Sequence, residues 1–219
     1  MIEAPASARL VEAFVNTVDV DRGTDDLAGR DDLAGRDDLA GRDDLAGRDG
    51  HSGPDGHSGP GGCSGPDRLA AWLAHHRLLD PGVSVTPGDH RLGLSLRDGI
   101  RAELGARAGD TPDPEAASAA GGALAELPLL AGGRPGGAVL VPAPHLTPVR
   151  HALAVIAIAW SELLITGDAD RLKRCAEHAC AWVFWDVSKN RSRRWCSMRV
   201  CGNRTKARRY AAKRATANG

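Results

Sequence analysis

Residues 171–210 have the sequence RLKRCAEHACAWVFWDVSKNRSRRWCSMRVCGNRTKARRY, in which cysteines recur as two close pairs. The pairs follow the pattern C-x4-C-x15-C-x4-C and are formed by Cys175, Cys180, Cys196 and Cys201. Each pair can close a tight knuckle, and the loop between the pairs lets the second knuckle fold back on the first, which suits one tetrahedral metal ion. Four thiolates leave no coordination position open for water or substrate. The pattern therefore predicts one structural Zn2+ and no catalytic metal.

Two other interpretations of these cysteines are weaker. His178 lies inside the first knuckle and could replace one thiolate, but the four cysteines already complete a ligand set. Disulfides are the other alternative. The first residues, Met1–Leu10, contain no basic segment followed by an apolar stretch, so we expect no secretory signal and a cytoplasmic location. In a reducing compartment, clustered cysteines favour a metal over disulfides.

The segment between the cysteine pairs is predicted to form a β-hairpin. Trp182–Trp185 has strong strand propensity, Ser188–Asn190 is typical of a turn, and Arg193–Trp195 can return as the partner strand. Residues 197–214 contain mostly helix-forming residues. The order knuckle, hairpin, knuckle, helix is that of a treble-clef zinc finger. Its aromatic residues are expected to pack around the metal rather than stack on bases, because so small a module has little other core. These residues are Trp182, Phe184, Trp185 and Trp195.

Positive charge is concentrated at the same end of the chain. Residues 171–219 contain 14 Lys and Arg and two acidic residues, although the whole chain has 28 of each. This part is therefore formally +12, and residues 1–170 are −12. Such segregation is typical of a basic module for a polyanion attached to an acidic body, with a solvated basic tail as the alternative.

Basic residues also form stripes on the predicted last helix. Lys206, Arg209 and Lys213 share one face, and Arg204 and Arg208 form a second stripe. The apolar strip left for packing is narrow, so the metal is expected to anchor this helix and a polyanion to complement it. The residues predicted to contact nucleic acid are Arg191, Arg193, Arg194, Arg204, Lys206, Arg208, Arg209 and Lys213.

The rest of the chain is predicted to be mostly helical. Apolar residues recur at helical spacing between Leu10 and Val18 and between Leu69 and His76, the second segment after Asp67 as its expected N-cap. Residues 115–127 predict a weaker, alanine-rich helix. Leu92–Leu96 alternates like a short strand, with residues 138–141 as its expected partner.

The clearest helix is predicted from a Thr147 cap to a Gly167 end. It is apolar nearly all round and should be central. Its apolar run, residues 152–165, is shorter than the roughly 20 residues of a membrane span, so no membrane partner is expected. The predicted fold class is therefore mainly α (α+β): a helical N-terminal domain with a small β-hairpin, followed by a treble-clef-like four-cysteine module.

Hexapeptide repeats occupy residues 25–66. DDLAGR occurs four times in succession from Asp25 to Arg48, and three related units follow. Leucines six residues apart step by about 240° around a helix and form no apolar stripe. The array is therefore predicted to be a disordered acidic insertion. Metal binding by His51, His57 and Cys63 is not expected, because nothing orders them into a site.

The segment quoted above resembles the CGNR zinc-finger family, named for the run from Cys201 to Arg204. Members usually carry an N-terminal ABATE domain, described as a candidate stress-induced transcription regulator, and Phe14–Asp19 resembles the Asn-Thr motif near its start. The resemblance implies zinc at the four cysteines and DNA binding. It divides the chain into an ABATE-like domain, residues 1–170, and a CGNR-type finger, residues 171–215. The repeat array departs from the family pattern, because it separates the first two predicted helices.

These observations favour a DNA-binding transcription regulator in the bacterial cytoplasm, associated with the nucleoid. Its helical domain would sense a small-molecule signal or self-associate. An RNA-binding or ribosome-associated zinc module and a protein-interaction adaptor are the alternatives, because a basic face serves all three. An enzyme is not expected, since no grouping of nucleophile, base and oxyanion donors is visible and the predicted metal site is closed.

Overall fold

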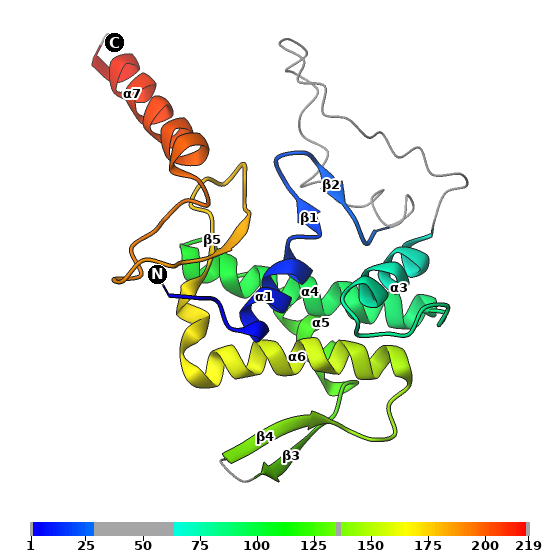
Figure 1. Ribbon diagram of the computed structural model, residues 1–219. Helices are drawn as coiled ribbons and strands as arrows, with labels where there is room; N and C mark the ends of the chain where they lie inside the picture. Colours follow the sequence, from blue (N-terminus) through cyan, green and yellow to red (C-terminus); the bar gives the residue numbers. More distant parts are fainter. Residues whose placement is uncertain (1, 29–63, 135–136, 218–219) are drawn as a thin grey trace.

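The structure is a computed structural model that describes residues 2–28, 64–134 and 137–217. A body of packed helices carries a small four-cysteine module at one end, and the last helix projects from that module (Figure 1). The elements are α1 (Ala6–Val15), β1 (Val18–Asp19), β2 (Thr24–Asp25), α3 (Gly65–His75), α4 (Pro87–Ala108), α5 (Pro114–Ala125), β3 (Leu129–Arg134), β4 (Gly137–Pro142), α6 (Pro148–Thr166), the 3-10 turn η1 (Asp168–Arg171), β5 (Leu172–Arg174), β6 (Val183–Trp185), the π-turn η2 (Met198–Gly202) and α7 (Asn203–Ala217). The predicted fold class is confirmed.

Helix α6 is the central element of the body. The Thr147 hydroxyl accepts a hydrogen bond from the Arg150 N–H, Pro148 occupies the first turn, and Gly167 ends the helix in the left-handed region with φ 76°. Its buried face contacts α1, α4 and β4. Among the described helices, α6 alone is long and apolar enough to span a membrane. However, 56% of that stretch is buried in the protein, and a core helix passes the same test.

Helix α4 shows that the strand predicted at Leu92–Leu96 is wrong. These residues lie inside a helix of 22 residues that Thr86 caps and Gly109 ends with φ 102°. The buried positions Leu92, Leu96, Ile100 and Leu104 are four residues apart, so the helical period extends back through the segment whose local alternation is typical of a strand.

The predicted helix at residues 115–127 is confirmed as α5, which lies against α4. A Cβ at Gly99 of α4 would overlap the Ala120 methyl group, so the glycine permits this close approach. The predicted strand at residues 138–141 is confirmed within β4, but its partner is β3. The pairing is antiparallel, with Leu129 opposite Pro142, and a local hairpin closes a shorter loop than pairing with residue 92 would.

The start of the repeat array lies in described structure. Asp25 pairs with Val18 in the β1–β2 sheet, and Leu27 and Ala28 are buried. The His90 Nε2 atom lies 2.9 Å from the Leu27 carbonyl oxygen. The ordered chain therefore extends further into the first DDLAGR unit than predicted.

The end of the array is also described, because Ser64 is the N-cap of α3. The Ser64 hydroxyl accepts from the Asp67 N–H while the Asp67 carboxylate accepts from the Ser64 N–H. The predicted N-cap, Asp67, is therefore the third helical residue of a capping box. Residues 29–63 lie outside the described part of the chain, with His51, His57 and Cys63 among them, and the predicted disorder of the insertion stays a prediction.

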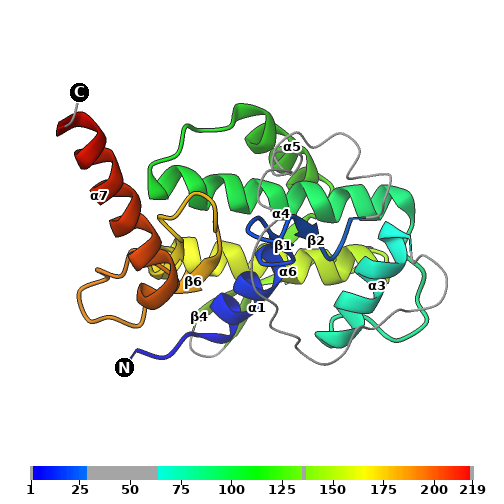
Figure 2. The same ribbon diagram turned by 90° about the horizontal axis from the view of Figure 1, so that it is seen from above.

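The four-cysteine module shares the main hydrophobic core of the body. Leu172 of β5 and Val183 and Trp185 of β6 are buried in the same cluster as α1, α4 and α6. Seen from above, α4 and α6 run alongside each other, and α7 points away from both (Figure 2). The module is thus fixed to the body by its strands and extends from it by its last helix.

Candidate metal centre and nucleic-acid interface

The four cysteines of the predicted zinc site converge on one point. Their sulfur atoms all lie within 4.8 Å of one another, and the Cys180–Cys196 and Cys196–Cys201 Sγ distances are both 3.6 Å. Four ligands at about 2.3 Å from a tetrahedral zinc would lie about 3.8 Å apart, so this spacing suits the ion. It is too long for a disulfide, whose sulfur atoms lie about 2.05 Å apart. The four cysteines hold one structural zinc.

The electrostatics of the quartet also call for a cation. Burial is the largest effect and raises the pKa of the Cys201 thiol to about 11, and the adjacent Cys180 and Cys175 sulfurs add to the rise. The pKa of the Cys196 thiol is raised for the same reasons. Four thiolates this close together are stable only around a positive ion. His178 is 80% exposed and pairs with the Asp110 carboxylate at 3.4 Å, so the structure does not place it among the ligands.

The first knuckle is the turn of a β-hairpin. β5 runs into Cys175, whose N–H donates to the Trp182 carbonyl at 2.8 Å, and β6 follows directly. Ala181 has φ 49°, which reverses the chain after the second ligand. The prediction that β6 pairs with Arg193–Trp195 is therefore wrong. The C-x4-C turn brings the residues before and after it into antiparallel pairing, and Leu172–Arg174 occupies that edge.

The aromatic residues of the module are packed as predicted, although around two centres. Phe184 is buried against Cys175 and Cys201, with half-buried Trp182 and Trp195 beside it. Trp185 lies instead in the main core, where its Nε1–H donates to the Ile2 carbonyl at 3.3 Å. Sequence reasoning missed this second role, because it treated the module as a separate core.

Two family comparisons agree with this geometry. The CGNR zinc finger family matches residues 171–214, and the ABATE family, described as "Putative stress-induced transcription regulator", matches residues 52–167. The second match spans more than half of the 219 residues. The chain belongs to the ABATE family. No match was found among curated proteins. A zinc finger joined to a domain of a regulator family makes the protein a zinc-binding regulator, and neither family is described by an enzymatic reaction.

Asn16 and Thr17, the predicted Asn-Thr motif, form the junction with the CGNR finger. The Asn16 Nδ2 donates to the Val183 carbonyl at 2.8 Å, and the Val183 N–H donates to Asn16 Oδ1 at 2.9 Å. The side-chain amide thus pairs with β6 as a neighbouring strand would. The neighbouring Thr17 hydroxyl accepts a hydrogen bond from Arg97 at 3.2 Å. The resemblance of this segment to a family motif stays a prediction, because the ABATE match covers residues 52–167, and the contacts of Asn16 and Thr17 were not predicted.

A buried ion pair lies behind this junction. Arg97 donates to both carboxylate oxygens of Asp25 at 2.7 and 2.8 Å, and both side chains are fully buried. Burial alone would raise the pKa of the Asp25 carboxyl. The hydrogen bonds from Arg97, Leu27 and Ala28 outweigh burial and hold this pKa below its usual range. Such a pair was not predicted, because Asp25 belongs to a repeat unit that occurs four times.

The basic residues predicted to contact nucleic acid fall into two groups. Four are held by protein partners: Arg191 by Asp170 at 3.1 Å, Arg193 by the Trp195 carbonyl at 2.9 Å and by that of Cys196, Arg204 by Asp21 at 3.0 Å, and Arg208 by the buried Glu177. Arg194, Lys206 and Arg209 are exposed on the CGNR finger and belong to the second group, and Lys213 is exposed on the same helix as Lys206 and Arg209.

Glu177 is a site residue that sequence reasoning missed. Its side chain is fully buried in the first knuckle, where it accepts hydrogen bonds from the Thr205 hydroxyl at 3.2 Å and from Arg208. The single Thr205 hydroxyl hydrogen is shared with the Cys201 carbonyl, which lies 2.9 Å away. These contacts fix the first turn of α7 to the zinc site. The signal for Glu177 was its position as one of two acidic residues in a strongly basic segment.

Proposed function

We propose that the protein is a transcription regulator that binds DNA through α7 of its CGNR finger. The exposure of α7 carries this proposal. Every residue from Ala207 to Arg214 is exposed, and Tyr210 retains 65% of its surface. The narrow strip expected to pack against the module, Ala207, Tyr210 and Ala211, is exposed with the rest. A helix that is exposed all round from Ala207 to Arg214 gains little from packing there, so a partner outside the described chain would account for its composition.

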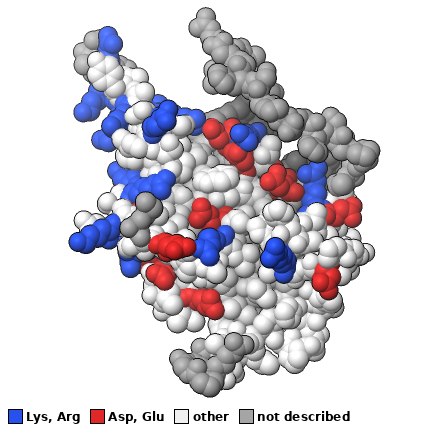
Figure 3. All heavy atoms as spheres, viewed as in Figure 1, with Lys and Arg blue, Asp and Glu red and all other residues white. Residues whose placement is uncertain are grey.

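The chemistry of α7 indicates the class of that partner. Lys206, Arg209 and Lys213 are exposed on one face, and no acidic residue lies anywhere in Asn203–Ala217. Lys and Arg cover α7 and the adjoining side of the finger, whereas Asp and Glu lie on the body (Figure 3). Contacts between Lys or Arg side chains and backbone phosphates neutralise the phosphate charge and supply most of the affinity for a nucleic acid.

The attachment of α7 supports binding in a defined orientation. Zinc fixes Cys201 at its base, and Glu177 holds Thr205 and Arg208 of its first two turns. The projecting helix therefore needs no ordering before it docks, which lowers the entropic cost of binding. Arg208 and Arg204 serve this attachment or the contact with the body, so we assign the primary phosphate contacts to Lys206, Arg209 and Lys213.

The shape of α7 favours DNA over RNA. The major groove of B-DNA, about 12 Å wide, admits an α-helix, whereas the major groove of A-form RNA is too deep and narrow. Single-stranded RNA is usually bound by stacking on aromatic side chains. The aromatic residues of the described finger are packed, except Tyr210, over which Arg214 lies at 5.9 Å. We accordingly place the protein in the cytoplasm with the nucleoid.

Fluorescence anisotropy with labelled duplex DNA, duplex RNA and single-stranded RNA tests this proposal. We expect the tightest binding to duplex DNA, and a plot of log affinity against log salt should fall by about 0.9 per phosphate contact. Lys206→Ala and Arg209→Ala should each lower that slope by about one unit. Arg91→Ala, an exposed arginine of α4, is the matched control and should leave the slope unchanged. Salt-independent binding, or equal effects of Arg91→Ala and Arg209→Ala, would contradict the proposal.

A further inference from the structure

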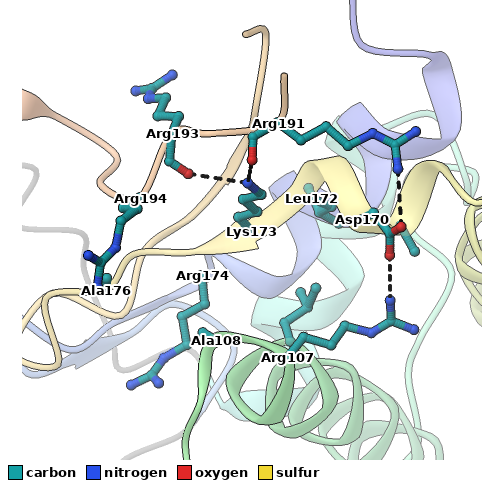
Figure 4. Close-up of a pocket in the computed structure, with 12 residues that line it drawn as sticks. Arg107, Ala108, Asp170, Leu172, Lys173, Arg174, Ala176, Arg191, Arg193 and Arg194 are labelled. Atoms are coloured by element: carbon teal, nitrogen blue, oxygen red, sulfur yellow. Dashed lines mark hydrogen bonds and ion pairs between the residues drawn. The ribbon is translucent and has the colours of Figure 1, made fainter. Parts of the chain in front are cut away.

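A recess lies where the ABATE domain meets the CGNR finger. Its volume is about 500 Å3, within the usual range of small-molecule sites. The last turn of α4 and η1 form one wall, and β5 with the loop of residues 191–194 forms the other (Figure 4). Pockets between domains are frequent ligand sites, because a ligand there contacts groups from both sides.

The lining of this recess is strongly cationic. Six Lys and Arg residues line it, against the single carboxylate of Asp170. Carboxylates just outside the lining, Glu103, Asp110 and Asp186, pair with some of these cations, so a surplus of two positive charges remains in the neighbourhood. The cationic residues are Arg107, Lys173, Arg174, Arg191, Arg193 and Arg194.

Two of the six cations build the wall. The Lys173 ammonium donates to Asp186 at 2.8 Å, to the Arg193 carbonyl at 3.4 Å and to the Arg191 carbonyl, which uses all three of its donors. The Arg193 guanidinium is bonded to two carbonyls of the second knuckle and covers the Phe184 ring at 4.6 Å. These residues hold the loop in place and are not available to a ligand.

Three other cations present donors to the recess. Arg107 of the ABATE domain and Arg191 of the finger converge on Asp170 from opposite walls, at 3.2 and 3.1 Å (Figure 4). One exposed carboxylate thus serves two guanidinium groups. Arg194 lies over the Trp195 ring at 5.4 Å, and no acceptor in the described part of the chain bonds to it. Asp170 therefore marks a place where the fold already holds an anionic group between the two domains.

We propose that this recess binds a small molecule that carries a terminal phosphate group. The phosphate would contact Arg107 and Arg191, because guanidinium groups bind phosphate oxygens in pairs, and Arg194 on the other side of the recess would add to the attraction without touching it (Figure 4). The remainder of the molecule would lie against Ala108 and Ala176, which give the recess an apolar part. The carbonyl groups in the last turn of α4 carry partial negative charge and would repel a phosphate. The phosphate therefore enters along the opposite wall, which the cationic CGNR finger forms.

The surroundings of the recess favour a small ligand over the backbone of a nucleic acid. A duplex that reached Arg107 would also approach Glu103 and Asp110 on the ABATE domain, whose chain segment, residues 1–170, carries a formal charge of −12. A compact phosphate monoester avoids these carboxylates. Contacts to both domains would let such a ligand stabilise one arrangement of the finger on the body, which is how an effector acts on a regulator.

Titration calorimetry with the full-length, zinc-loaded protein tests the site in the absence of nucleic acid. The probes are inorganic phosphate, pyrophosphate and AMP, with adenosine as the neutral control. We expect saturable binding of at least one phosphate probe at one per chain, and none of adenosine. Arg107→Ala and Arg191→Ala should each weaken binding about tenfold or more, because each removes a charge-assisted contact. Arg209→Ala on α7 should have no effect.

Asp170→Asn gives the sharpest result, because the effect should have the opposite sign. Neutralising the carboxylate frees Arg191 and the Nη1 atom of Arg107, whose other donors stay on Glu103, so binding should become severalfold tighter. Failure of all three phosphate probes, weaker binding by Asp170→Asn, or an equal loss with Arg209→Ala would overturn the proposal. If no phosphate probe binds the protein and Arg107→Ala lowers the affinity for duplex DNA, the recess belongs to the nucleic-acid interface instead. Equal zinc content and melting temperature in every variant exclude unfolding as the cause.

Discussion

The two halves of the CGNR finger share one metal but are held in different ways. β5 and β6 place Leu172, Val183 and Trp185 in the main core of the body, and Asn16 adds two hydrogen bonds at their edge. Among the residues whose burial is described, the second knuckle and α7 contribute none to that core, and α7 is exposed from Ala207 to Arg214. One half therefore attaches the finger to the ABATE domain. The other half depends on zinc for its position and remains open to a partner.

Loss of zinc should separate the two halves most clearly. Structural zinc contributes roughly 10–16 kcal/mol of apparent binding energy that is also folding energy. In Cys201→Ser we expect residues 198–214 to lose their protection from hydrogen exchange, while β5 and β6 keep most of theirs through the core. Zinc analysis and hydrogen-exchange mass spectrometry measure both effects. Cys63→Ser, outside the quartet, is the control and should retain one zinc per chain. Equal loss of protection in both halves would refute the division.

Loss of the buried Asp25–Arg97 pair should have the next largest effect on stability. This loss should affect the body and the half of the finger that is attached to it. Asp25→Ala removes the bidentate partner of the buried Arg97, which keeps the Asp98 carboxylate at 3.0 Å. The cost should therefore lie at or below the low end of the about 3–5 kcal/mol typical of a broken buried pair. Thermal and urea unfolding of the full chain measure the change. Asp31→Ala alters the equivalent residue of the next DDLAGR unit and serves as the matched control. A similar loss from both substitutions would show that the position of Asp25 is not what matters.

The same pair predicts a pH dependence. Because the pKa of Asp25 is lowered in the folded protein, its stabilisation is fully present above the unfolded value of about 3.9 and is lost as the pH falls through the folded value. The stability difference between the wild type and Asp25→Asn should therefore be constant above about pH 5 and shrink below about pH 4. Urea melts across this range give the difference. A stability difference between the wild type and Asp25→Asn that grows as the pH falls would show that the ion pair does not lower the pKa of Asp25.

Asn16→Ala should weaken the attachment of the finger by a smaller amount. It removes two hydrogen bonds to Val183 and leaves half-buried backbone groups without this partner, at a cost of about 1–3 kcal/mol. Hydrogen exchange should quicken in β6 and leave zinc content unchanged. Asn203→Ala removes a bond from an exposed asparagine to the Arg199 carbonyl and should have little effect on β6.

Deletion of residues 31–48 should have the smallest effect. It keeps one DDLAGR unit, and with it Asp25, Leu27 and Ala28, while shortening the connection between β2 and α3. Halving a loop changes its closure free energy by only about 0.6 kcal/mol. Thermal melts and DNA binding should therefore match the wild type within about 1 kcal/mol. A larger loss would show that the later repeat units contribute to the fold.

The sequence by itself determined the local features of this protein. The zinc quartet follows from spacing, because two close pairs of thiolates are what a tetrahedral ion requires. The bounds of α6 follow from Thr147, Pro148 and Gly167, because caps act within one turn of the helix they begin or end. The exposed cations of α7 follow from a helix that lacks an apolar face.

Only the tertiary structure decided which residues from distant parts of the chain meet. By strand propensity, β6 could pair with Arg193–Trp195 or with Leu172–Arg174. It pairs with Leu172–Arg174, because the turn of the first knuckle brings these residues beside it. Asp25 is indistinguishable in sequence from Asp31, and only the position of Arg97 and Thr17 distinguishes it. The arginines of the finger look alike as charges, yet Arg193 braces carbonyls, Arg204 pairs with Asp21, and Arg209 is exposed. Long-range partners depend on the packing of the whole chain, and no local pattern specifies them.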